Sequence, residues 1–355
     1  MDTLIENWIT RIADAARSGA SLTIRGGGSK DFYGGPERGE RLEVSEHRGV
    51  VAYEPTELVV TARAGTPLVE LAATLADKGQ WLAFEAPHFG PSATVGGMLA
   101  SGLSGPRRQA VGALRDFVLG VKMLSGSGEV LSFGGQVMKN VAGYDVPRLL
   151  AGSLGTFGVV LEASFKVLPL PVAEKSLRFA LDEAAALARL NEWGGRPLPI
   201  SASAWHDGTL TLRLSGAAAA VEAAQRNLAG EPLADADAAA FWHSVREQTH
   251  AFFAGDAPLW RLSLPSVAPL QALGPTLVEW GGAQRWLRAG DARAIRVAAA
   301  KAGGHATLFR ADDALKTSAG VFQPLAAPLA RIHRQLKSAF DPQGVFNRGR
   351  MYPDF

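Results

Sequence analysis

The chain contains no cysteine among its 355 residues. It therefore forms no disulfide bond and offers no thiolate to a zinc ion or an iron–sulfur cluster. The sequence also has no uninterrupted apolar run of roughly 18 residues, the length that a membrane span needs. A secretion signal is excluded in the same way, because Glu6, Arg11 and Asp14 interrupt the apolar runs at the start. These absences favour a cytoplasmic protein that reaches a membrane only through partners.

Charge is nearly balanced, with 36 basic and 34 acidic side chains and a net charge of +2. No basic run is present that would indicate nucleic-acid binding. The hydrophobic content of 47% over this length predicts a substantial core and room for two domains.

Three glycine-rich loops stand out against this ordinary composition. In the first, a short apolar strand at 21–24 runs into the sequence RGGGSK, residues 25–30. Successive backbone N–H groups of such a loop form a nest for an anion, and Arg25 and Lys30 add positive charge. Residues 31–36 cannot open a long helix, so the Rossmann and P-loop interpretations both lack the structural context they require.

The second loop, residues 87–105, combines small residues with the hydroxyls of Ser92, Thr94, Ser101 and Ser104. This composition suits close contact with a ring system together with hydrogen bonding. The third loop lies in 139–169, where glycines at 152, 155 and 158 precede a buried strand beginning at Val159. Taken alone, this third segment is better explained as a turn between structural elements.

Together these loops resemble the FAD-binding domain of the vanillyl-alcohol-oxidase class of flavoproteins, also called the PCMH-type domain. Residues 25–30 resemble its pyrophosphate loop, and 92–105 resemble the loop against the isoalloxazine and pyrophosphate. The run RDFVLG at 115–120 and the segment 139–168 match further family motifs. Near the end, DPQGVFN at 341–347 resembles the signature that returns to the flavin in FAD-linked dehydrogenases of 2-hydroxy acids.

The resemblance implies a set of residues that contact FAD. They are Arg25, Gly26, Gly27, Gly28, Ser29, Lys30, Pro87, His88, Ser92, Thr94, Gly96, Gly97, Ser101, Gly102, Ser104, Gly105, Arg115, Asp116, Val121, Gly155, Gly158, Val159, Val160 and Asn347. Relatives that hold flavin covalently use a cysteine or a histidine, and the first loop has Ser29 and Lys30 instead. We therefore expect non-covalent FAD.

A closer resemblance covers nearly the whole chain. Phrases such as GPRR, FGGQVMKNVAGYD, WGGAQRWL and AGGHAT look like those of the FAD-binding subunits of bacterial glycolate oxidases. The resemblance implies a larger FAD-containing catalytic subunit, an iron–sulfur subunit and a small 2-hydroxy acid substrate, glycolate or D-lactate. Two departures, Arg348 and the polar insert at 312–320, put only the local C-terminal geometry in doubt.

The expected fold is α+β. We expect a two-lobed PCMH-type FAD-binding domain at 1–170, a ferredoxin-like α/β cap domain at 171–290 and a C-terminal segment at 291–355 that returns to the flavin site. The β-α-β-β-α order after residue 175, with residues 260–264 as the last strand, suggests the ferredoxin-like cap. A D-G pair at 207–208 predicts a hairpin inside it. The sequence shows no internal repeat.

Catalytic residues are harder to assign. Oxidation of a 2-hydroxy acid needs a base for the hydroxyl proton and a cation for the carboxylate. His305 and Arg310 are the candidate pair, with a structural role for His305 as the alternative. No metal site is expected, because the metal-binding histidines that the larger catalytic relatives present are absent here.

Three functions stay open at this point. In the first, the chain is a redox subunit whose FAD carries electrons from a 2-hydroxy acid through an iron–sulfur subunit to an acceptor such as quinone. In the second, it is an assembly subunit in which FAD holds the fold. The third is a stand-alone FAD-dependent reductase. The catalytic serine and glutamate that this third function requires have no clear counterpart in the cap.

Overall fold

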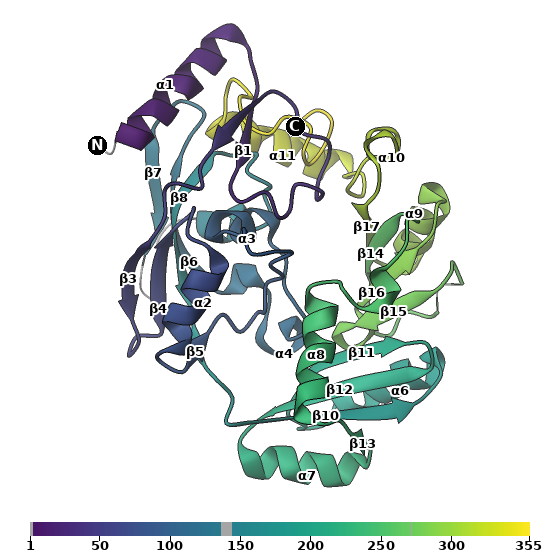
Figure 1. Ribbon diagram of the computed structural model, residues 1–355. Coiled ribbons are helices and arrows are strands. Elements are labelled where there is room, and N and C mark those ends of the chain that lie inside the picture. Colours follow the sequence, from purple (N-terminus) through teal and green to yellow (C-terminus); the bar gives the residue numbers. More distant parts are fainter. Residues whose placement is uncertain (1–2, 136–143, 271) are drawn as a thin grey trace.

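The computed structural model describes residues 3–135, 144–270 and 272–355. Two large sheets lie in separate halves of the molecule (Figure 1). The first has five strands in the order β3-β4-β8-β6-β7, all antiparallel. Its strands are β3 Val50–Glu54, β4 Val59–Arg63, β6 Val118–Leu124, β7 Val130–Gly134 and β8 Val159–Lys166.

Two hydrophobic cores give this first half the expected two lobes. One core lies between the five-stranded sheet and helices α2 and α3, and the other lies under helix α1 and the parallel pair β1–β2. Strand β8 contributes side chains to both cores. The remaining elements are α1 Thr3–Ser18, β1 Leu22–Arg25, β2 Glu40–Glu43, α2 Leu68–Ala76, β5 Gln80–Trp81, α3 Val95–Ser101, α4 Arg108–Val111, the 3-10 turn η1 Leu114–Asp116, α5 Val146–Leu150 and β9 Leu168–Pro169.

The second sheet has eight strands in the order β13-β10-β12-β11-β15-β16-β14-β17. The first four strands in the sheet follow the ferredoxin-like order. They lie in the order β13, β10, β12, β11, which are the fourth, first, third and second strands of this unit in the chain. The predicted hairpin joins β11 to β12 through Asp207 and Gly208. The elements are β10 Ala173–Ala180, α6 Glu183–Gly194, β11 Ile200–His206, β12 Thr209–Gly216, α7 Ala218–Leu228, β13 Glu231–Pro232 and α8 Asp235–Arg246.

The other four strands form a second unit with the same order, reversed along the sheet. In the sheet they lie in the order β15, β16, β14, β17, which are the second, third, first and fourth strands of this unit in the chain. The two units join edge to edge, because β11 pairs with β15. Among the described residues 264–270 and 272–275, this second unit has no helix between its first two strands. Its elements are η2 Ala251–Phe253, β14 Leu259–Ser263, β15 Thr276–Glu279, η3 Trp280–Gly282, β16 Gln284–Arg288, α9 Ala292–Lys301 and β17 His305–Arg310.

One expectation about this half is corrected. The last strand of the ferredoxin-like unit is β13, whereas residues 260–264 fall largely in β14 and open the second unit. The eight-stranded sheet extends through β17. The expected domain boundaries stay a prediction.

The chain returns to the first half after this sheet. Helices α10 Asp313–Ala319 and α11 Ala327–Phe340 lead to residues 345–347, where Phe346 bridges to Leu22 at the edge of β1. Asp341 is 1% exposed and accepts hydrogen bonds from the backbone N–H groups of Val345 and Phe346, both at 2.8 Å. The buried ammonium of Lys337 donates to Asp341 at 2.7 Å and to the carbonyls of Thr156 and Phe346.

Asp341→Ala tests this return. The substitution leaves the Lys337 ammonium buried without its carboxylate, so we expect the free energy of unfolding to fall by about 3–5 kcal/mol. Denaturant unfolding measures the change. Asp354→Ala is the matched control, because its ion pair with Arg334 is more than half exposed and should be worth at most about 1 kcal/mol. Equal losses in the two variants would contradict a special role for Asp341.

Candidate functional site

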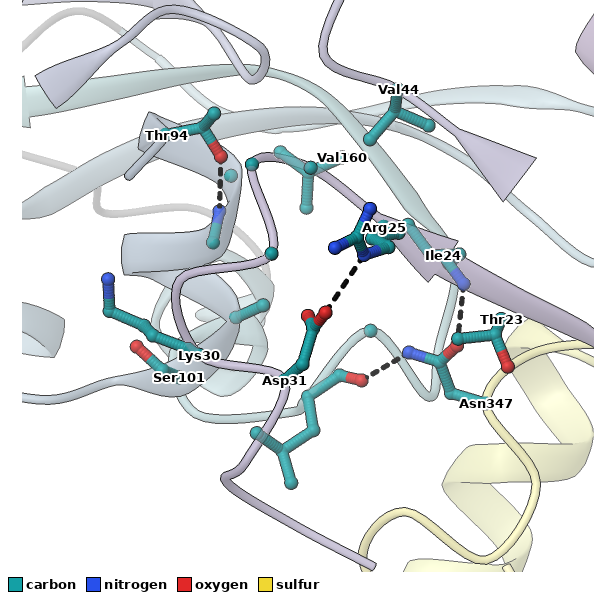
Figure 2. Close-up of a pocket in the computed structure, with 18 of the residues that line it drawn as sticks. Thr23, Ile24, Arg25, Lys30, Asp31, Val44, Thr94, Ser101, Val160 and Asn347 are labelled. Atoms are coloured by element: carbon teal, nitrogen blue, oxygen red, sulfur yellow. Dashed lines mark hydrogen bonds and ion pairs between the residues drawn. The ribbon is translucent and has the colours of Figure 1, made fainter. Parts of the chain in front are cut away.

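Four segments that are distant in the sequence meet around one cavity. They are the first glycine loop, helix α3, the loop before β8 and the C-terminal residues near 347 (Figure 2). Fourteen of the residues proposed from the sequence line it: Arg25, Gly26, Gly27, Gly28, Ser29, Lys30, Thr94, Gly96, Gly97, Ser101, Gly155, Gly158, Val160 and Asn347.

The first loop has the geometry of an anion nest. Gly28 adopts the left-handed conformation with φ +73°, and within the described chain the N–H groups of Gly26 and Gly27 donate no hydrogen bond. Behind the loop there is no spare room, because a Cβ on Gly27 would lie 1.5 Å from the carbonyl oxygen of Ser92. Thr94 sits beside it and caps α3 by accepting a hydrogen bond from Gly97. The loop thus presents unpaired backbone donors to the cavity from a tightly packed base.

The two cations of the loop have different surroundings. Arg25 binds Asp31 at 2.8 Å and Glu43 at 3.5 Å, and its pKa is raised chiefly by the hydrogen bond to Asp31 (Figure 2). Lys30 is 9% exposed and donates to the carbonyl of His88 at 3.1 Å. Burial lowers the pKa of Lys30 to about 8, with Glu247 acting weakly in the opposite direction. Lys30 is therefore the loop cation whose charge depends on pH near neutrality.

Asn347 ties two walls of the cavity together. Its side-chain oxygen accepts from the N–H of Ile24 at 2.8 Å, and its amide donates to the carbonyl of Leu154 at 2.5 Å (Figure 2). Arg350, which the sequence did not single out, is 8% exposed and binds the carbonyls of Asp31, Tyr33 and Gly35. It holds the loop that follows Lys30. The only signal in the sequence was an arginine shortly after the DPQGVFN motif.

Other proposed residues lie outside this cavity. Val121 and Val159 are buried at 4% and 0% exposure in strands of the sheet, Ser92 is exposed, and Gly102 ends α3 against Gly152. Arg115 is exposed, and Asp116 accepts from the N–H of Ala113, so both belong to the turn before β6. Pro87, Ser104 and Gly105 line a second, smaller cavity, and His88 lines an open groove.

The structure does not bring His305 and Arg310 together. They begin and end β17, so about 16 Å of extended chain separates them, and a β-bulge before Arg310 breaks the alternation of side chains along the strand. His305 is exposed beside Ser263, and partial desolvation of its ring together with the charge of Arg261 lowers its pKa. Arg310 donates to Gln248 at 2.9 Å and stacks on Phe32, with its guanidinium carbon 4.0 Å from the ring centre. Neither residue lines the first cavity.

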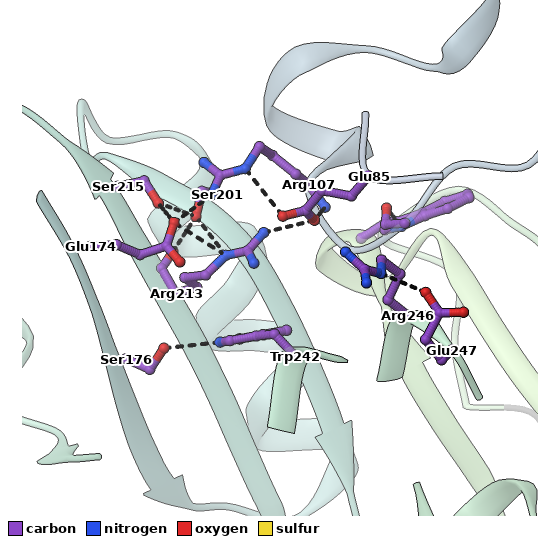
Figure 3. Close-up of polar contacts among 12 residues, drawn as sticks. Glu85, Arg107, Glu174, Ser176, Ser201, Arg213, Ser215, Trp242, Arg246 and Glu247 are labelled. Atoms are coloured by element: carbon purple, nitrogen blue, oxygen red, sulfur yellow. Dashed lines mark hydrogen bonds and ion pairs between the residues drawn. The ribbon is translucent and has the colours of Figure 1, made fainter. Parts of the chain in front are cut away.

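A buried polar network joins the two halves beside the site (Figure 3). Glu85 accepts from Arg107 of the first half and from Arg213 of β12, at 3.5 and 2.9 Å, and all three side chains are at most 7% exposed. Arg107 and Ser215 also bind Glu174 of β10. On the other side of the interface, Glu247 accepts from the backbone N–H groups of His88 and Phe89.

Residues 139–143, the start of the proposed third segment, lie outside the described residues together with 136–138. Within the described residues, no three His, Asp or Glu side chains are grouped to hold a metal ion. No helix there is long and apolar enough to cross a membrane.

Comparison with known proteins agrees with the geometry. Residues 5–134 match the FAD binding domain family. Alkyldihydroxyacetonephosphate synthase has a similar fold, with a TM-score of 0.65 over 96% of this chain and 75% of that chain at 14% identity. Together the family match and the fold define a protein with the PCMH-type FAD-binding fold.

Two relatives show to which family of FAD-binding proteins the chain belongs. The chain is 49% identical to "Glycolate oxidase subunit GlcE" of Escherichia coli K12, over 98% of this chain and 97% of that protein. It is 30% identical to "Glycolate oxidase subunit GlcD" of Bacillus subtilis 168, over 44% of this chain and 33% of that protein. The chain belongs to the GlcE family of glycolate oxidase subunits.

FAD affinity should depend on pH through Lys30. The ammonium loses its charge near pH 8, so FAD should bind more weakly at pH 9 than at pH 7, because the diphosphate is an anion. Lys30→Met should bind FAD weakly at both values and remove most of this pH dependence. Fluorescence titration of the apoprotein with FAD measures both effects.

The control for this titration is Lys78→Met, because Lys78 is exposed and far from the cavity lining. It should titrate as the wild type does. A Lys30→Met protein with the unchanged wild-type profile would remove Lys30 from the site.

Proposed function

We propose that the chain is the FAD-binding redox subunit of a glycolate oxidase complex that oxidises glycolate, and also D-lactate, to the 2-oxo acid. The observation that carries this proposal is the convergence of the RGGGSK loop, α3 and Asn347 on one cavity in a chain 49% identical to GlcE along its length. FAD supplies the hydride acceptor for such an oxidation. The chain's own residues bind and orient it.

The residues present fit the cofactor. The backbone donors of Gly26 and Gly27 and the charge of Lys30 suit the diphosphate. Val44, Ala64 and Val160 give the cavity an apolar wall for a ring. The chain has no cysteine, and no histidine is among the described residues that line the cavity, so we propose that the FAD is held non-covalently.

The partners follow from what the chain lacks. Without a cysteine it offers no cluster ligands, so electrons that leave its flavin for a distant acceptor pass to an iron–sulfur subunit. The shared similarity with GlcD supports a larger FAD-containing catalytic subunit as the other partner. We place the complex in the cytoplasm, with membrane contact through the partners and an acceptor such as quinone.

An assembly role is the second candidate. It is favoured by the separation of His305 from Arg310 and by the absence of a grouped metal site among the described residues. In that case the FAD would stabilise the fold without turning over. The stand-alone reductase has no observation in its favour.

Gly27→Ala should abolish retention of FAD. Its Cβ would overlap the carbonyl of Ser92, so the loop must shift and the nest is lost. Gly194→Ala is the control, since a Cβ there meets nothing within 4 Å. Absorbance of the purified proteins gives the FAD content, and acid precipitation should release the wild-type cofactor. A Gly27→Ala protein with one FAD per chain would show that the diphosphate lies elsewhere.

The redox role is tested by anaerobic mixing of the FAD-loaded chain with glycolate and with D-lactate. Loss of oxidised flavin absorbance in the chain alone would place substrate oxidation on this subunit. Loss only after the partner subunits are added would make the chain an electron carrier between subunits. No loss in either experiment would favour the assembly role.

A further inference from the structure

An open cleft of about 410 Å³ lies where the C-terminal residues pass beside helix α11 (Figure 1). Its walls are the start of α11, the loop between α10 and α11, residues 35–38 and residues 351–355. The rings of Phe322, Tyr352 and Phe355 make its interior largely apolar. None of the described residues lines both this C-terminal cleft and the FAD cavity. The volume lies within the range of sites that bind another molecule.

An apolar strip on α11 continues from the cleft onto the open surface. Leu329 and Ile332 are 51% and 48% exposed, although both are large aliphatic residues. Leu329 lies four positions before His333, which lines the cleft, and three positions before Ile332, so the three side chains are neighbours on the helix. A small molecule in the cleft would leave this strip exposed to water. A polypeptide can cover the cleft and the strip together.

The other side of the cleft is basic. Helix α11 contains no aspartate or glutamate. Arg334 lines the cleft, Arg331 lies three positions before it, and Arg38 lines the cleft from the loop before β2. Arg38 and Arg331 are exposed and make no hydrogen bond or ion pair with the described residues. Arg334 has only an exposed ion pair with Asp354, at 3.1 Å. The rim therefore complements acidic side chains.

We propose that the C-terminal cleft and the adjoining strip of Leu329 and Ile332 form a docking surface for another subunit of the complex. The segment that docks inserts an apolar side chain into the cleft and places acidic side chains against Arg38, Arg331 and Arg334. The identity of the partner as a subunit of the oxidase rests on the proposed function. The apolar and basic character of the surface rests on the geometry alone.

Two other occupants fit the surface less well. In a symmetric dimer of this chain the same patch would meet itself, so Arg331 and Arg334 of one copy would face the arginines of the other. An anionic lipid surface would match the charge. However, it lies across the outermost side chains and would leave the aromatic walls of the concave cleft uncovered. A partner polypeptide satisfies the charge, the strip and the cleft.

The experiment measures binding of the FAD-loaded chain to the larger flavoprotein subunit and the iron–sulfur subunit, immobilised together, by interferometry. Wild type should bind saturably. Leu329→Glu and Ile332→Glu should each lose about tenfold or more in affinity, because each places a carboxylate in an apolar contact. Arg331→Gln should bind more weakly at low salt and depend less on salt concentration. All three variants should keep the wild-type FAD content, since none of these residues lines the FAD cavity.

Val69→Glu is the matched control, because Val69 is a 51% exposed aliphatic residue on helix α2, outside the cleft lining. It should bind as the wild type does. Wild-type affinity in both Leu329→Glu and Ile332→Glu would overturn the docking surface and leave the proposed function standing. A wild-type chain that binds neither subunit would instead contradict the proposed function.

Two further measurements test the other occupants. Co-sedimentation with phosphatidylglycerol vesicles tests a lipid surface, and analytical ultracentrifugation of the chain alone tests a second copy. Neither should show binding that Ile332→Glu removes. Vesicle binding or self-association that is present in wild type and lost in Ile332→Glu would overturn the assignment of this surface to a partner subunit.

Discussion

The cofactor cavity depends on the side chain of Asn347, which joins segments more than 300 residues apart. One amide group accepts from Ile24 on β1 and donates to Leu154 in the loop before β8. The residue itself has a φ of +46°, a left-handed conformation that asparagine tolerates better than most residues. Asp341 and Lys337 hold the backbone that delivers it. A distortion of this turn would separate the nest from the loop that faces it.

The carboxylate of Glu85 is a second constraint, because it binds arginines from both halves. It is shared by Arg107 and Arg213, and Glu174 supplies the other negative charge, so two cations and two anions are balanced at the interface. Removing one member would leave a buried charge unpaired, which is far more costly than losing an exposed ion pair. The same Glu85 also raises the pKa of Glu279, although less than burial does. The interface and the buried carboxylate at the end of β15 are therefore electrostatically coupled.

Much of the first cavity could be predicted from the sequence because its walls are backbone. Glycine-rich loops are visible in a sequence, and a resemblance to known motifs indicates which of them face one another. The direction in which each side chain points was harder to predict from the sequence. Val159 and Val160 are adjacent in the same strand, yet β8 turns Val159 into the core and Val160 towards the cavity, as strand alternation requires.

The second half of the cap could not be predicted for a different reason. Its four strands share an order of pairing with the first unit, and that order is a property of long-range hydrogen bonds rather than of residue pattern. Arg310 shows the same limit on prediction from sequence. The sequence paired it with His305 because the two are close along the chain, but an extended strand holds them at its two ends, about 16 Å apart.

The position of Tyr33 connects these findings. It lies in the loop that Arg350 holds, it lines the first cavity, and its hydroxyl binds Arg261 of the sheet that carries Glu279. A cofactor that orders residues 25–33 would therefore also fix the hydroxyl that orients Arg261.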